Sequence, residues 1–235
     1  MPDYQTKQET IAIAGAADLI IRSLLDRQQF ADPQGAAEAL GISSAAWPMF
    51  GLLWPSSLHL AQHMAARAMV PNERVLEVGC GLGLASLVCH RRGVDMTASD
   101  CHPLAGLFLA ENLRLNGLSP MPYRQGDWAA APDAAPMPGG QHRVDGHFDL
   151  IIGSDVLYER DDGGLLCNFI NRHASARAEV LIVDPNRGNR TAFNRRMQTI
   201  GFALADHPIM GAVAQTDGKA YRGHMLQYMR SKRAI

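Results

Sequence analysis

The chain has 235 residues, of which 47% are apolar and 19% are charged, and its formal net charge at pH 7 is −1. This length and composition suit one large globular domain, or one domain with an N-terminal extension. Because the net charge supplies no global positive field, we do not expect a nucleic-acid partner.

The first part of the chain is expected to be an N-terminal helical extension with an aromatic loop over residues 1–55, ahead of a main domain over 56–235. Apolar residues at helical spacing predict a helix over 10–28. A shorter helix is expected over 34–40, where Gly41 stops it.

The aromatic loop of this extension covers residues 42–55 and contains the pairs Trp47-Pro48 and Trp54-Pro55. Proline restricts the residue before it away from the α conformation, so we expect ordered loop or extended chain here. Pro55 is expected to begin the helix predicted over 56–68.

From residue 74 onward, short apolar runs alternate with helical patterns, which predicts a doubly wound, Rossmann-like α/β fold with a mostly parallel sheet. The expected strands are 74–79, 95–99, 122–125, 148–154 and 178–184, and the expected helices are 82–92, 103–116, 162–173 and 189–200. Two further strands, over 202–209 and 224–230, have no helix between them and predict a terminal antiparallel pair. Residues 129–146 are rich in Pro, Ala and Gly and predict a surface loop.

The most informative motif follows the first of these strands, where Gly79, Gly81 and Gly83 occupy alternate positions. Glycine tolerates positive φ and has no Cβ, so the backbone can approach a polar ligand closely. A dinucleotide fingerprint needs glycine at its first, third and sixth positions, and the sixth position here is Leu84. The spacing therefore disfavours an NAD-binding oxidoreductase and favours a ligand without phosphate, such as S-adenosylmethionine.

Ligands of open α/β sheets bind beyond the carboxyl ends of the strands, where this chain has several polar residues. Asp100 could accept hydrogen bonds from both hydroxyls of a ribose, or cap the following helix. Asp127 could accept from an adenine amine while Trp128 covers the ring, or the two could be a loop aspartate and a packing tryptophan. Glu77 could orient a ligand's ammonium group through water, or be a buried strand residue.

The E-x-G-x-G-x-G pattern with a downstream acid resembles the class I (seven-β-strand) methyltransferases that use S-adenosylmethionine, over about residues 74–230. The resemblance implies S-adenosylmethionine as cofactor, S-adenosylhomocysteine as product, and a seven-stranded sheet with an antiparallel C-terminal strand. It places Glu77, Gly79, Gly81 and Gly83 against the methionine portion, Asp100 on the ribose, and Asp127 and Trp128 by the adenine.

A narrower resemblance comes from Asp155-Val156-Leu157-Tyr158, which matches the D-x-x-[YF] element of the protein lysine methyltransferases grouped as methyltransferase family 16. Trp54-Pro55-Ser56-Ser57 resembles their tryptophan-bearing segment. Asp184-Pro185-Asn186-Arg187 resembles the Asp-Pro-Gly-Arg of electron-transfer-flavoprotein β-subunit lysine methyltransferases, and the asparagine also tolerates the left-handed conformation. The resemblance implies a protein substrate.

For a lysine acceptor, Asp155 is expected to hold the incoming ammonium group and Tyr158 to shape its channel. Trp54 is expected to form a lid over the methyl site, and Ser154, at the end of its strand, to join the cofactor-binding residues. The alternatives are a cofactor ligand or helix cap for Asp155, and core packing for Tyr158 and Trp54.

The alternative activity is methyl transfer to a small molecule or an RNA, with the same cofactor-binding residues. A non-catalytic scaffold would show a broken glycine loop or a missing acid, and the sequence shows neither. His59 and His63 are spaced i, i+4 without the glutamate of H-E-x-x-H, so we expect no metal ion.

The remaining expectations concern compartment. The four cysteines form no C-x-x-C pair, which favours reduced thiols in a cytoplasmic protein. The first ten residues are too polar for a signal peptide, and no apolar run approaches the ~20 residues that span a bilayer. We therefore expect no membrane partner.

Overall fold

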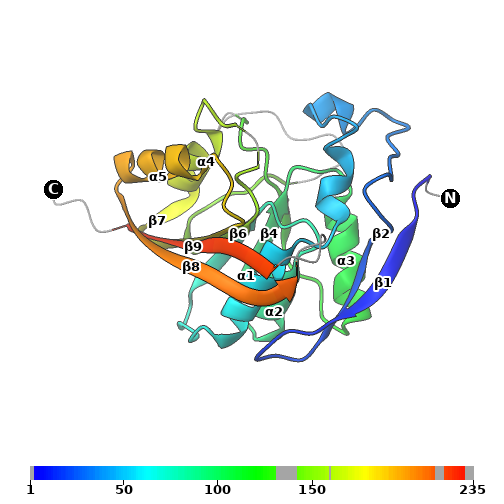
Figure 1. The fold of residues 1–235 in the computed structure, drawn as a ribbon, viewed down its shortest axis with the longest axis horizontal. Helices are drawn as coiled ribbons and strands as arrows, with labels where there is room; N and C mark the ends of the chain where they lie inside the picture. Colours follow the sequence, from blue (N-terminus) through cyan, green and yellow to red (C-terminus); the bar gives the residue numbers. More distant parts are fainter. Residues whose placement is uncertain (1–2, 131–141, 159, 215–219, 231–235) are drawn as a thin grey trace.

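The computed structural model describes residues 3–130, 142–158, 160–214 and 220–230. Its centre is a seven-stranded sheet with the order β5-β4-β3-β6-β7-β9-β8 (Figure 1). The strands are β3 (Arg74–Val78), β4 (Asp95–Asp100), β5 (Tyr123–Gln125), β6 (Phe148–Ser154), β7 (Ala174–Asp184), β8 (Phe202–Ala214) and β9 (Ala220–Arg230). Strands β3 to β7 pair in parallel, and β9 runs antiparallel to both of its neighbours. The α/β fold and the terminal antiparallel pair are confirmed.

The helices cover both faces of this sheet. They are α1 (Pro55–Ala66), α2 (Leu84–Arg91), α3 (Ala105–Leu115), α4 (Leu165–His173) and α5 (Arg190–Thr199). Leu150 and Ile152 of β6 belong to the hydrophobic cluster that includes α1, α2 and α3, whereas Ile151 belongs to the cluster with α4 and α5. Alternate side chains of the central strands are therefore buried on opposite faces, as expected for a parallel sheet between two helical layers.

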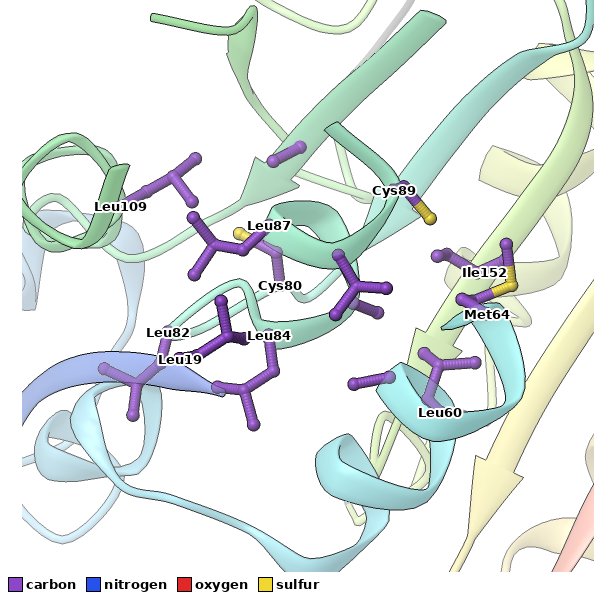
Figure 2. Close-up of a cluster of buried hydrophobic side chains, with 14 of the residues drawn as sticks. Leu19, Leu60, Met64, Cys80, Leu82, Leu84, Leu87, Cys89, Leu109 and Ile152 are labelled. Atoms are coloured by element: carbon purple, nitrogen blue, oxygen red, sulfur yellow. The ribbon is translucent and has the colours of Figure 1, made fainter. Parts of the chain in front are cut away.

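The N-terminal region packs on one of these layers. Figure 2 shows Leu19 from this region beside Leu82 and Leu84 of the glycine loop and the start of α2, with Leu60 and Met64 of α1 in the same cluster. Residues on both sides of the expected boundary at 55/56 therefore share one hydrophobic cluster. The division of the chain into two domains at this boundary stays a prediction.

The predicted helix over 10–28 is wrong, and so is the helical character of the extension. The chain forms an antiparallel pair, β1 (Thr6–Ile11) and β2 (Leu19–Leu24). Gly15 lies between the strands with a φ of 85°. Burial alternates at Leu19, Ile20 and Ile21, which is the period of a strand and not of a helix. The clustered β-branched residues favour this outcome.

The free edge of β2 is bonded by two asparagine side chains, one from α3 and one directly after it. The Ile20 N–H donates to Asn116 Oδ1 at 3.0 Å, and Asn116 Nδ2 donates to the Ile20 carbonyl at 2.8 Å. The Arg22 N–H donates to Asn112 Oδ1 at 2.8 Å. Four residues along a helix rise ~6 Å and two along a strand ~6.6 Å, so the two pairs match in spacing.

Two short 3₁₀ helices precede α1. Glu38–Leu40 replaces the longer helix predicted over 34–40, and Trp47–Gly51 lies within the segment 42–55 that was predicted as ordered loop or extended chain. Trp54 is extended, and Pro55 begins α1 as predicted. Part of the loop predicted over 129–146, namely 131–141, lies outside the described residues. Within the described ranges, no helix combines the length and apolar character that a membrane span would need.

Candidate cofactor and substrate site

The glycine loop connects β3 to α2 and lies where three other parts of the chain meet it. Gly79, Gly81 and Gly83 have φ values of 59°, 51° and 75°, a region that side-chain-bearing residues rarely adopt. A Cβ on Gly79 would lie 2.8 Å from Val156 Cγ1, and one on Gly81 would lie 2.8 Å from the carbonyl oxygen of Phe50. A Cβ on Gly83 would lie 2.5 Å from Leu109 Cδ1 of α3. A side chain at each of these three positions would therefore clash with a different neighbouring residue.

Asp100, at the end of β4, is bonded to this loop. Its Oδ2 accepts a hydrogen bond from the Gly81 N–H at 2.9 Å, and its Oδ1 accepts from the His102 N–H at 2.9 Å. The residue is 7% exposed, and burial raises the pKa of its carboxyl group. Cys101 gives the same carboxylate further hydrogen bonds, from its backbone and its side chain. Asp100, the residue predicted to bind a ribose, is therefore held in place beside the glycine loop.

The Glu77 side chain is bonded to the first turn of α2. It is 1% exposed, and it accepts hydrogen bonds from the Ser86 N–H at 2.9 Å and from the Ser86 hydroxyl. Burial raises the pKa of Glu77 to about 7. These contacts favour the structural alternative, in which Glu77 fixes the first turn of α2.

Trp128 and Asp127 follow β5. The Trp128 ring lies beside Gly79, with Cζ2 3.9 Å from where a glycine Cβ would be, and its Nε1 is buried with no hydrogen-bond partner among the described residues. Asp127 Oδ1 accepts from the Ala129 N–H at 3.0 Å, and Oδ2 lies 3.7 Å from Arg143 Nη1. The structure thus brings Trp128 to the first glycine and leaves Asp127 in a loop ion pair.

The N-terminal segment contributes an aromatic stack that the sequence did not reveal. Phe50 stacks on His102 with ring centroids 3.7 Å apart and an angle of 12°, and Trp47 packs edge-on against the same histidine. Burial lowers the pKa of His102 to about 3, so the ring is neutral at neutral pH. Trp54 is half-buried; its Nε1 donates to the Met49 carbonyl at 2.9 Å.

The loop after β6 carries the predicted substrate residues. Asp155 has a φ of 55°, and its N–H donates to the Val183 carbonyl at 2.8 Å. Its carboxylate is held by Arg187 through two bonds, Nε to Oδ1 at 2.8 Å and Nη2 to Oδ2 at 3.0 Å. Ser154 pairs with Val183 in the sheet, and Tyr158 is 47% exposed. The sequence does not assign Arg187 to the site, because 32 residues separate it from its partner.

Arg187 belongs to the Asp-Pro-Asn-Arg turn that ends β7. Asn186 has a φ of 64°, so the asparagine adopts the left-handed conformation in place of glycine as predicted. Asp184 is fully buried, and its Oδ2 accepts from the Arg187 N–H at 2.8 Å. Burial and the nearby Asp155 raise the pKa of Asp184. Tyr221 of β9 lies nearby and shares a 3.0 Å hydrogen bond with Ser56.

The histidine pair with possible metal-binding spacing lies on α1. His59 packs against the Tyr221 ring with centroids 4.4 Å apart. Among the described residues, no group of three or more His, Cys, Asp and Glu side chains could hold a metal ion. A metal-free site stays a prediction.

The strand order, the glycine loop after β3 and the acid at the end of the neighbouring β4 define the class I S-adenosylmethionine-dependent methyltransferase fold. A solved structure with this fold, the magnesium protoporphyrin IX methyltransferase of Synechocystis PCC 6803, matches with a TM-score of 0.55 and 16% identity, over 74% of this chain and 78% of that one.

A family model described as lysine methyltransferase matches residues 46–199, and the chain belongs to that family. The electron transfer flavoprotein beta subunit lysine methyltransferase of Xenopus laevis is 29% identical over 60% of this chain and 53% of its own length. The Mus musculus protein of the same name is 27% identical over 64% of this chain and 56% of its own length. The chain therefore spans about half the length of these relatives.

Proposed function

We propose that this chain transfers a methyl group from S-adenosylmethionine to a lysine side chain of a protein. The observation that carries the proposal is the Asp100 carboxylate, which the N–H groups of Gly81 and His102 fix beside the glycine loop at the end of β4. A ribose offers two adjacent hydroxyl donors of the kind that a carboxylate at this place in the fold accepts.

The remaining cofactor contacts follow from the same place in the fold. The loop of Gly79, Gly81 and Gly83 would hold the methionine portion, and Asp127 and Trp128 the adenine, with Ser154 and Trp54 completing the site. When bound, the cofactor supplies an electrophilic methyl group on a sulfonium. The buried Nε1 of Trp128, which has no partner among the described residues, fits a polar ligand next to Gly79.

The protein residues then have to position the acceptor and exclude water. Holding a nucleophile in line can supply ~7–11 kcal/mol of the barrier. A lysine must also lose a proton, because its ordinary pKa is about 10.4, and apolar walls lower that pKa. Asp155, held by Arg187, and the half-exposed Tyr158 would line this acceptor side.

A protein lysine is proposed as acceptor because the family description and the names of the relatives specify it. We further propose that the chain acts in the cytoplasm and binds neither membrane nor metal.

Two measurements test the proposal. Saturating S-adenosylmethionine should raise the melting temperature by mass action, and NAD should not. Tritiated methyl groups from S-adenosylmethionine should then appear on recombinant electron transfer flavoprotein β subunit, or on a cell-lysate protein, as methyllysine after acid hydrolysis. Absence of a thermal shift contradicts the cofactor assignment. Label that is lost on ribonuclease treatment, or that stays in the small-molecule fraction, would support the alternative activity instead.

A further inference from the structure

Asp184 has one carboxylate oxygen that the described part of the protein leaves without a partner. Oδ2 accepts the Arg187 N–H at 2.8 Å, whereas Oδ1 is buried and has no donor within hydrogen-bond distance. The whole residue is 0% exposed. An unsatisfied buried acceptor is rare and destabilising, more so when it is charged. A hydrogen-bond donor on a bound ligand would explain why this oxygen has no partner in the protein.

Asp184 lies at the carboxyl end of β7, next to the loop that carries the proposed substrate residues. Asp184 ends β7, and the turn that follows it supplies Arg187, which binds Asp155 after β6. The residue after Asp155, Val156, lies against Gly79 of the glycine loop. A short chain of contacts therefore connects Asp184 to the loop that would hold the methionine portion.

The two arginines near Asp184 lower the pKa of its carboxyl group through their charge, but their side chains are bonded to other carboxylates. Arg187 is bonded through its side chain to both oxygens of Asp155. Arg190 lies 3.4 Å from Asp206, which also contacts His224 at 2.7 Å. The cluster of Asp155, Arg187 and Asp184 therefore has a net charge of −1 when both acids are ionised.

Asp155 was expected to hold the incoming ammonium group, and its contacts with Arg187 do not favour that role. A carboxylate with a guanidinium on both oxygens offers a neutral pair to an incoming ammonium group. Asp184 offers, in the same cluster, a carboxylate oxygen without a hydrogen-bond partner among the described residues. We propose that Asp184 Oδ1 accepts a hydrogen bond from the amine of the methyl acceptor, and that Asp155 and Arg187 position the loop beside it. The inference rests on the proposed methyl transfer to an amine.

The test uses Asp184→Asn, which is nearly isosteric. The asparagine oxygen can still accept the Arg187 N–H and keep the turn, while its NH₂ group replaces the unpartnered oxygen and turns an acceptor into a donor. The matched control is Asp149→Asn. Asp149 is an exposed residue at the opposite end of β6, and it also accepts a backbone N–H, that of Arg74 at 3.2 Å.

Each protein is saturated with S-adenosylhomocysteine and titrated by NMR with butylammonium chloride, a lysine side-chain mimic, and with n-butanol as the neutral probe. We expect saturable butylammonium binding to the wild type and to Asp149→Asn, about ten- to hundredfold weaker in Asp184→Asn, as for a lost charge-assisted hydrogen bond. Butanol binding should not differ between the three proteins.

Equal butylammonium binding by the wild type and Asp184→Asn would overturn the inference, and so would indifference of the wild type to this probe. Failure of S-adenosylhomocysteine itself to bind would instead contradict the proposed function. Methyl transfer to the β subunit gives a second readout: Asp184→Asn should lower kcat and leave KM for S-adenosylmethionine unchanged, while Asp149→Asn keeps both.

Discussion

At the scale of single residues, Asp100 joins the glycine loop to β4 and carries the proposed ribose contact. Asp100→Ala should weaken S-adenosylhomocysteine binding by about ten- to hundredfold, because it removes charge-assisted hydrogen bonds of ~1.5–3 kcal/mol. Isothermal titration calorimetry measures this directly. Asp95→Ala is the control, since Asp95 begins the same strand and its side chain is 64% exposed. Equal affinities for both variants would remove Asp100 from the cofactor site.

A substitution at Asp155 tests its proposed role on the acceptor side of the site. The substitution should remove the charge of the side chain without straining the backbone. Asp155→Asn keeps a residue that tolerates positive φ, whereas alanine at this φ of 55° adds strain. Asp155→Asn should therefore bind S-adenosylhomocysteine with unchanged affinity and show a kcat lower by about tenfold or more. Calorimetry and methyl-transfer kinetics on the same preparation measure the two effects. A variant with the full rate would assign Asp155 a purely structural role.

Glu77 predicts a pH dependence of stability. Its pKa is about 7 in the folded protein against an ordinary value of 4.5, so between these values the folded state holds a proton that the unfolded state has lost. The free energy of unfolding contributed by Glu77 is fully present below pH 4.5 and falls as pH rises through about 7, by at most ~3 kcal/mol at 1.36 kcal/mol per pKa unit. Urea unfolding at pH 5 and pH 8 should show a smaller pH difference for Glu77→Gln than for the wild type. Identical pH differences would contradict the assignment.

At the scale of elements, the β1–β2 pair depends on α3 and the residue that follows it. Asn112 and Asn116 supply the hydrogen bonds that a neighbouring strand would otherwise give to β2. Replacing both with alanine should lower the free energy of unfolding by about 1–3 kcal/mol for each group left unsatisfied. Amide hydrogen exchange should show the loss first in residues 19–24. Uniform loss of protection across the central sheet would argue against a local role.

The same elements show how far prediction from sequence reaches. The buried runs of β6 and β7 are recognisable because both of their faces are apolar, which leaves little ambiguity. The β1–β2 pair is mistaken for a helix because its apolar residues also fit a helical period, and a bonding partner lies 90 residues away in α3. In the site, the glycine loop and Asp100 follow from local spacing, whereas the Arg187 bond to Asp155 and the stack of Phe50 on His102 depend on tertiary packing.

At the scale of the whole molecule, Trp47 connects the N-terminal residues to the methyltransferase sheet. It is 1% exposed and packs against Tyr4, Phe30, Phe50 and His102. Trp47→Ala should lower the free energy of unfolding by about 3–5 kcal/mol, the usual range for a buried tryptophan. Because the surrounding cluster is shared, calorimetry should show a single transition shifted to lower temperature. Two separate transitions would instead support independent domains on either side of residue 55.

Asn112 links two parts of this chain that lie far apart in the sequence. Its side-chain oxygen holds Arg22 of β2, and its side-chain nitrogen donates to the carbonyl of Leu82 in the glycine loop at 3.2 Å. Residues 6–24 precede the stretch that matches the family model, which starts at residue 46. One side-chain amide therefore bonds both the N-terminal hairpin and the glycine loop. A substitution at position 112 that loosens the hairpin would also remove a hydrogen bond from that loop.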